Sequence, residues 1–175
     1  MKQLLSSNQI RDGVRQLAEQ LREYYGGRPL TIVAILTGSL VLLADLIRQL
    51  DMPLRVALIQ ANRYRTPDNP ADTSEFNTAL LPKLKGRDVL VIDDIFDTGH
   101  TLVEVIAQIL QYEPKSLRSA VLMRKSGRSE VPIQPDIVMF EIPDEFVVGY
   151  GLDYEDKFRN LPYVAALEPE DLAAQ

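Results

Sequence analysis

Hydrophobic positions near the start of the chain follow helical spacing. They are Ile10, Val14, Leu17, Leu21 and Tyr24. This spacing predicts an amphipathic helix, which residues 7–8 (Ser-Asn) would cap and residues 26–27 (Gly-Gly) would end. Residues 30–36 (LTIVAIL) then form a short apolar run rich in β-branched residues, which predicts a buried strand.

Strand-like and helix-like segments continue to alternate along the chain. Residues 37–39 (Thr-Gly-Ser) predict a turn that leads into a helix over residues 40–50. A later helix is predicted over residues 101–112, and Pro114 stops it. The further predicted strands are residues 54–59, 89–92, 117–123 and 137–140. This alternation indicates βαβ units, so the predicted fold class is α/β with a mainly parallel sheet.

One long segment, residues 60–78, departs from this alternation. It is polar, contains Pro67 and Pro70, and shows no clear hydrophobic period. We therefore predict a loop here. A loop of this length inside a compact domain is usually either functional or disordered.

Length and composition narrow the class of protein. The 175 residues are 46% hydrophobic and 25% charged, which is typical of one soluble globular domain. The absence of cysteine and the single histidine exclude disulfides, thiolate metal sites and multi-histidine metal sites. The net charge of −6 argues against a nucleic-acid partner. We find no signal peptide and no membrane span in the pattern, so a cytoplasmic location is expected.

Three carboxylates follow the strand predicted over residues 89–92. They are Asp93, Asp94 and Asp97, and the residues after Asp97 begin the next helix. Ligands of open α/β sheets bind at the carboxyl ends of the strands, and a helix start attracts anions such as phosphate. One turn thus offers carboxylates for hydroxyl groups or Mg²⁺ and amides for a phosphate. A phosphorylated sugar needs both.

The alternative is that Asp97 is an ordinary helix cap and that Asp93 and Asp94 lie in a solvated loop. The full string, four apolar residues followed by DDIFDTGHT, is more specific than that. It resembles the phosphoribosyl-diphosphate (PRPP) binding motif of type I phosphoribosyltransferases. The resemblance implies a three-layer fold, a mainly parallel twisted sheet flanked by helices with a small hood.

The resemblance also implies roles for single residues of the string. Asp93 and Asp94 would hold the ribose hydroxyls and Mg²⁺, the amides of the turn would hold the 5′-phosphate, and Asp97 would be the catalytic proton acceptor. The whole implied nucleotide-binding set is Asp93, Asp94, Ile95, Phe96, Asp97, Thr98, Gly99, His100 and Thr101.

Residues 143–163 (PDEFVVGYGLDYEDKFRNLPY) resemble the hood of hypoxanthine-guanine phosphoribosyltransferases. This resemblance implies that Phe146 stacks on a purine and that the backbone of Val147 reads the purine edge. It places Asp153 at the purine pocket as a ligand of Mg²⁺, and Arg159 on pyrophosphate. Without the motif, Phe146 would be a core aromatic and Asp153 a turn carboxylate.

In the same family a lysine after the fourth strand donates to the 6-oxo group of the purine. Lys125 matches it, with Arg124 as the rival, and either could be a solvated strand end. A cation at this place favours 6-oxopurines over adenine, because the amino group of adenine would form a mismatched polar pair.

Two further segments match the family less closely. Thr37 and Gly38 match the pyrophosphate loop, where many relatives have lysine in place of Thr37; a plain turn is the alternative. Residues 60–78 match the mobile active-site loop, and Tyr64 matches its tyrosine, whereas Arg63 and Arg65 depart from the family.

The implied function is purine salvage. PRPP and a 6-oxopurine (hypoxanthine, guanine or both) would give IMP or GMP and pyrophosphate, with Mg²⁺ as cofactor. One domain, residues 1–175, would carry a hood formed by residues 142–167 and the N-terminus, in a homo-oligomer (dimer or tetramer). There are three alternatives: an enzyme of the same class for another base, a structural domain without a ligand, and a regulatory relative that contacts RNA. The acidity of the chain disfavours the last of these.

Overall fold

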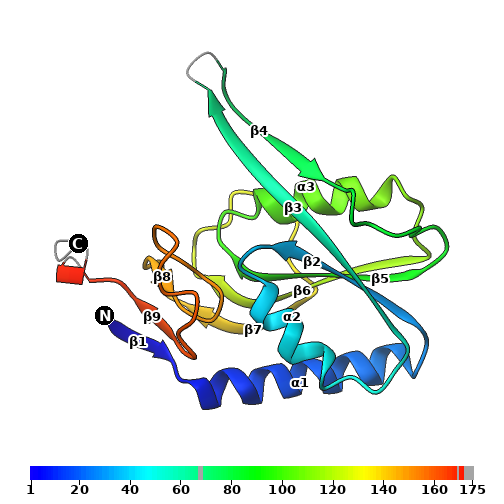
Figure 1. The fold of residues 1–175 in the computed structure, drawn as a ribbon, viewed down its shortest axis with the longest axis horizontal. Helices are drawn as coiled ribbons and strands as arrows, with labels where there is room; N and C mark the ends of the chain where they lie inside the picture. Colours follow the sequence, from blue (N-terminus) through cyan, green and yellow to red (C-terminus); the bar gives the residue numbers. More distant parts are fainter. Residues whose placement is uncertain (67–68, 169, 172–175) are drawn as a thin grey trace.

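The computed structural model describes residues 1–66, 69–168 and 170–171, and Figure 1 shows their arrangement. A six-stranded sheet forms the centre, in the order β4-β3-β2-β5-β6-β7. Its strands are β2 (Leu30–Leu36), β3 (Leu54–Thr66), β4 (Asn69–Asn77), β5 (Asp88–Phe96), β6 (Ser116–Lys125) and β7 (Ile137–Ile142). Every neighbouring pair is parallel except β3 with β4.

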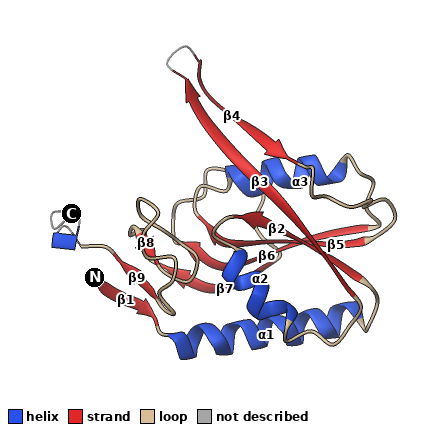
Figure 2. Cartoon of the chain, in the orientation of Figure 1, coloured by secondary structure: helices blue, strands red, loops and turns tan. Residues whose placement is uncertain are grey.

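Helices cover both faces of this sheet (Figure 2). Helices α1 (Ser7–Tyr25) and α2 (Leu40–Ile47) share one hydrophobic cluster with Ile32 and Ala34 of β2. Helix α3 (His100–Leu110) shares the other cluster with Val33 and Ile35. Successive residues of β2 thus face opposite helix layers, which explains why its sequence is continuously apolar. The predicted α/β fold class is confirmed: a mainly parallel sheet forms the middle layer, and helices form a layer on each side.

A second, smaller sheet joins the two ends of the chain. Its strands β1 (Lys2–Leu5), β9 (Val164–Ala166) and β8 (Val147–Val148) pair in the order β1-β9-β8, all antiparallel. The sequence pattern did not reveal these strands, because each is too short to show a period of its own. Strand β8 follows Phe146 directly, so this sheet carries that side chain to the carboxyl edge of the main sheet.

The ends of the helices differ in detail from the prediction. Ser6, rather than the predicted Ser7-Asn8 pair, caps α1, and its side chain and that of Gln9 form a reciprocal capping box. Tyr25 is 1% exposed, whereas Tyr24, which the spacing had assigned to the buried face, is 50% exposed. Helices α2 and α3 each end two or three residues earlier than predicted.

The prediction of a loop over residues 60–78 is wrong. Strands β3 and β4 continue through this segment as an antiparallel pair, with Gln60 opposite Asn77 and Tyr64 opposite Thr73. A hairpin that projects from the sheet need not alternate hydrophobic and polar residues, so its sequence shows no strand period. The side chain of Tyr64 lies outside the described part of the chain. No helix among the described residues is long and apolar enough to cross a membrane.

Candidate active site

A cavity of about 560 Å³ lies at the carboxyl end of β5. Eight of the nine residues predicted to bind a phosphorylated sugar line it; the exception is His100. Gly38 and Arg128 add to the lining from other loops. We call this space the sugar-phosphate cavity.

Asp93 and Asp94 are buried at the base of the sugar-phosphate cavity, 9% and 5% exposed. The amide of Asp94 donates to Asp93 Oδ1 at 3.0 Å, and the amide of Ile95 donates to Asp94 Oδ1 at 2.8 Å. Burial raises the pKa of Asp93 well above its usual range, and the neighbouring charge of Asp94 adds to this. Burial also raises the pKa of Asp94. A bound cation or hydroxyl donor would offset this cost of burial and favour the charged form of the pair.

The turn after Asp94 packs tightly against the rest of the protein at Gly99, whose backbone lines the sugar-phosphate cavity. Gly99 has a φ of +92°, and a Cβ there would lie 2.4 Å from Val131 Cγ2 and 2.6 Å from the Phe96 ring. Gly99 is also the N-cap position of α3, and no side chain caps that helix. The helix start therefore offers its amides and its positive dipole end to the cavity, as an anion site requires.

A second cavity, of about 430 Å³, adjoins the first. We call it the base cavity. It shares Leu36, Gly38, Asp94, Ile95 and Asp97 with the sugar-phosphate cavity. The residues predicted for pyrophosphate and purine all line it: Thr37, Gly38, Lys125, Phe146, Val147, Asp153 and Arg159.

Lys125, and not its rival Arg124, faces the base cavity. The Lys125 side chain is 10% exposed, and its Nζ donates to Asp97 Oδ2 at 3.1 Å. Arg124 instead binds Glu141, with Nε 2.7 Å from Oε1, and takes no part in lining this cavity.

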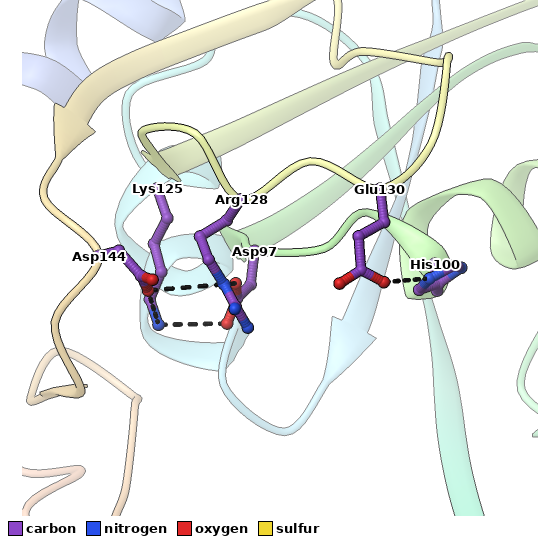
Figure 3. A network of polar contacts seen from close by, with 6 residues as sticks. All are labelled: Asp97, His100, Lys125, Arg128, Glu130 and Asp144. Carbon is purple, nitrogen blue, oxygen red and sulfur yellow. Dashed lines mark hydrogen bonds and ion pairs between the residues drawn. The ribbon is translucent and has the colours of Figure 1, made fainter.

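Asp97 lies at the boundary of the two cavities and is held by two cations (Figure 3). Arg128 Nε donates to Oδ1 at 3.0 Å, opposite the contact that Lys125 makes with Oδ2. Partial burial alone would raise the pKa of Asp97, but the hydrogen bonds from Arg128 and Lys125 outweigh it and hold the pKa below its usual value. Asp97 is therefore ionised near neutral pH.

The backbone between β2 and α2 fits tightly beneath the base cavity. The Leu36–Thr37 peptide bond is cis. A Cβ on Gly38 would lie 1.7 Å from Asp94 Oδ2, and one on Gly151 would lie 2.0 Å from the carbonyl oxygen of Gly38. The two glycines thus let three chain segments meet at one point of the site.

Arg159 and Phe146 complete the base cavity. Arg159 donates to the carbonyl oxygen of Gly151 at 2.8 Å and pairs with Asp153 at 2.8 Å, so these residues are fixed relative to one another. Phe146 is 54% exposed, and its ring meets the Tyr154 ring edge to face at 5.5 Å. It is not a core aromatic, and an exposed ring in a polar cavity is suited to stack on a flat ligand.

Sequence reasoning missed Arg128 and Asp144. Lys125 and Arg128 each lie near Asp144 Oδ1, at 3.6 and 3.5 Å. Arg128 follows β6 in a polar connecting segment, and Asp144 lies within residues 143–163, but the sequence around each gives no sign of what its charge contacts.

Mg²⁺ fits the carboxylates of this site. Within the described part of the chain, Asp93 and Asp94 form no ion pair, although both are buried. Among the described residues no three acidic or histidine side chains form a ready metal cluster. Mg²⁺ usually binds one or two carboxylates and completes its shell with substrate phosphates and water. Asp94 and Asp153, which line the base cavity, provide such a partial set.

Comparison with known proteins places this site in a family. The sequence pattern described as "Phosphoribosyl transferase domain" matches residues 1–155. The chain therefore belongs to the phosphoribosyltransferase family. A hypoxanthine-guanine phosphoribosyltransferase of Staphylococcus aureus strain Mu50 is 36% identical over 167 residues, which are 95% of this chain and 93% of that protein. Within the family, this chain thus groups with the hypoxanthine-guanine phosphoribosyltransferases.

Solved structures agree with this assignment. The chain superposes with a TM-score of 0.90 on a hypoxanthine-guanine phosphoribosyltransferase of Bacillus anthracis, at 33% identity, covering 96% of this chain and 99% of that one. For a hypoxanthine phosphoribosyltransferase of Trypanosoma cruzi the TM-score is 0.91, at 31% identity and 98% and 97% coverage. The chain also matches the bifunctional protein TilS/HprT of Listeria monocytogenes at 36% identity over 97% of its length, but spans only 26% of that protein.

Proposed function

We propose that this protein is a purine salvage enzyme. It transfers the 5-phosphoribosyl group from PRPP to N9 of hypoxanthine, guanine or both, and releases IMP or GMP and pyrophosphate. The observation that carries this proposal is the pair of adjoining cavities that meet at Asp94 and Asp97. A buried acidic pair and the start of a helix line the sugar-phosphate cavity. A lysine and an exposed aromatic ring line the base cavity.

The substrates are held as follows. The 5′-phosphate of PRPP accepts hydrogen bonds from the amides of residues 97–101, and the ribose hydroxyls donate to Asp93 and Asp94. Pyrophosphate lies against Thr37, Gly38 and Arg159. The purine stacks on Phe146, and its 6-oxo group accepts a hydrogen bond from Lys125. The backbone of Val147 recognises the edge of the purine.

Transfer begins when pyrophosphate leaves C1 of the ribose and the sugar gains oxocarbenium character. When Mg²⁺ is bound, by Asp93 and Asp94 or by Asp153, it supplies charge neutralisation for the leaving pyrophosphate. N9 of the purine attacks C1 from the opposite face. Asp97 accepts the proton that the purine loses, because its carboxylate is ionised and lies between the two cavities.

The proposal extends to parts of the molecule beyond the two cavities. The small sheet and residues 142–167 form a hood over the purine. Strands β3 and β4, with Tyr64, close over PRPP and exclude water. The protein works in the cytoplasm as a homo-oligomer, a dimer or a tetramer. Family resemblance supports these points.

Product analysis tests this function. The protein is incubated with PRPP, Mg²⁺ and hypoxanthine or guanine, and the products are separated by chromatography. We expect IMP or GMP and an equal amount of pyrophosphate. Tight binding of PRPP in calorimetry, without any nucleotide product from either base, would contradict the proposal and leave a nucleotide-binding protein without transferase activity.

A further inference from the structure

The connection between β6 and β7, residues 126–136, lies along the turn at residues 97–100. We call it the β6–β7 loop. Glu130 donates its amide to the carbonyl oxygen of Thr98 at 2.9 Å, and its carboxylate lies 3.0 Å from His100 Nε2. Val131 packs where a Cβ of Gly99 would stand. Together with the contact of Arg128 to Asp97, the loop therefore touches every residue of this turn.

Arg128 is the residue of this loop that reaches the reacting centre. With Lys125, Asp97 and Asp144 it forms a group of alternating charges, in which each cation touches both carboxylates (Figure 3). The four N–O distances range from 3.0 to 3.6 Å. Asp97 is the member of this group that also contacts both cavities.

The two cations approach Asp97 from different cavities. Arg128 lines the sugar-phosphate cavity and not the base cavity, whereas Lys125 lines the base cavity and not the sugar-phosphate cavity. Arg128 binds Oδ1 of Asp97, and Lys125 binds Oδ2. A carboxylate held at one oxygen only can rotate about its Cβ–Cγ bond, whereas one held at both oxygens keeps its plane across the cavity boundary.

Stability alone does not account for this arrangement. The Arg128 side chain is 41% exposed, and an ion pair at such an exposed place contributes little to folding. The same contact fixes the orientation of the proposed proton acceptor, and catalysis depends steeply on orientation.

We propose that Arg128 is a positioning residue for the phosphoribosyl transfer. By holding Oδ1 of Asp97, it keeps Oδ2 directed toward Lys125 and the purine. This inference rests on the proposed function, because Asp97 has a reaction to serve only if the protein transfers a phosphoribosyl group.

The first test replaces Arg128 and separates kcat from KM. In the full-length protein, we expect Arg128→Gln to lower kcat roughly ten- to hundredfold, with KM for PRPP changed less than about threefold. Arg128→Lys keeps a charged donor and should restore part of the lost kcat. Arg124→Gln is the matched control, since Arg124 lies in β6 just before this loop but binds Glu141, and the kcat of this variant should stay near wild type.

A double variant tests whether Arg128 acts through Asp97. In an Asp97→Asn background, Arg128→Gln should cause little further loss of kcat, because the residue it positions is already absent. Thermal unfolding of each variant confirms that it is folded. If Arg128→Gln lost its folding transition, the same comparison would be made with Arg128→Met, which also lacks the charged donor.

The outcomes separate this inference from the proposed function. If the wild-type protein turns over but Arg128→Gln has normal kcat, Arg128 is not a positioning residue. A raised KM for PRPP at unchanged kcat, or a full further loss of kcat in the Asp97→Asn background, would show that Arg128 acts on the substrate directly and would overturn the inference. A wild-type protein with no turnover on any purine would overturn the proposed function, and the inference with it.

Discussion

Lys125 Nζ lies 3.1 Å from Asp97 Oδ2, although the two residues are 28 positions apart in the sequence. Lys125 ends β6, and Asp97 follows the end of β5, the neighbouring parallel strand. Because parallel strands bring their carboxyl ends to one edge of the sheet, the fold places the two groups of opposite charge together. In the proposed reaction one of them recognises the purine and the other takes its proton.

Asp97→Asn tests the proton acceptor. The amide cannot accept a proton, so kcat should fall by about 10²–10⁴-fold, the usual contribution of general base catalysis. PRPP should still bind with nearly normal affinity, because the amides of the turn remain in place. Steady-state kinetics and titration calorimetry with PRPP measure the two quantities. Turnover near the wild-type level would remove Asp97 from the mechanism.

Lys125→Met tests recognition of the 6-oxo group. A hydrogen bond to a charged group contributes about 1.5–3 kcal/mol, so kcat/KM for hypoxanthine and guanine should fall about ten- to hundredfold. Discrimination against adenine should weaken at the same time. Arg124→Met is the control and should leave both quantities near wild type. Unchanged base selectivity in Lys125→Met would assign recognition of the 6-oxo group to another residue.

Phe146→Ala tests stacking of the base. Stacking of a base on an aromatic side chain contributes roughly 1–3 kcal/mol, so KM for the purine should rise about fivefold to a hundredfold. The melting temperature should change little, because the ring is 54% exposed. Leu110→Ala, equally exposed on α3, should change neither value. If KM for the purine were the same in Phe146→Ala as in the wild type, Phe146 would have no contact with the base.

Gly151→Ala tests the tight packing beneath the base cavity. Its added Cβ would meet the carbonyl oxygen of Gly38 at 2.0 Å, and the residue also has a φ of +101°. Gly86→Ala is the control, since Gly86 has a φ of +71° with open space around it. Backbone strain of this kind costs about 1–3 kcal/mol. Chemical denaturation should show a larger loss for Gly151→Ala than for Gly86→Ala, and equal losses would contradict the close contact.

The sugar-phosphate cavity could be predicted from the sequence because its parts are local. Residues 93–101 carry both the carboxylates and the helix start, so one continuous string specifies the geometry. Strands β2 and β5, the middle pair of the sheet, were equally clear, since each contains a continuous apolar run. Lys125 was predicted because it matches the family's lysine at the end of the fourth strand. The structure distinguishes it from Arg124, since Lys125 lines the base cavity and Arg124 binds Glu141.

Other features depend on contacts between distant segments and could not be read from one stretch. Strand β1 pairs with β9, more than 150 positions away, and neither is long enough to show a pattern. The β3–β4 hairpin is polar, so its strands look like a loop. The contact of Arg128 with Asp97 depends on how the β6–β7 loop packs along the turn at residues 97–100, which the sequence of neither segment indicates.

The most direct test of the central claim is pyrophosphate release from PRPP and Mg²⁺, with hypoxanthine, guanine, xanthine, adenine and uracil offered separately. We predict release with one or more of the 6-oxopurines, and none above background with adenine or uracil. Release with adenine or uracil but with no 6-oxopurine would contradict the role given to Lys125. The absence of release with any of the five bases would contradict the assignment of this protein as a purine phosphoribosyltransferase.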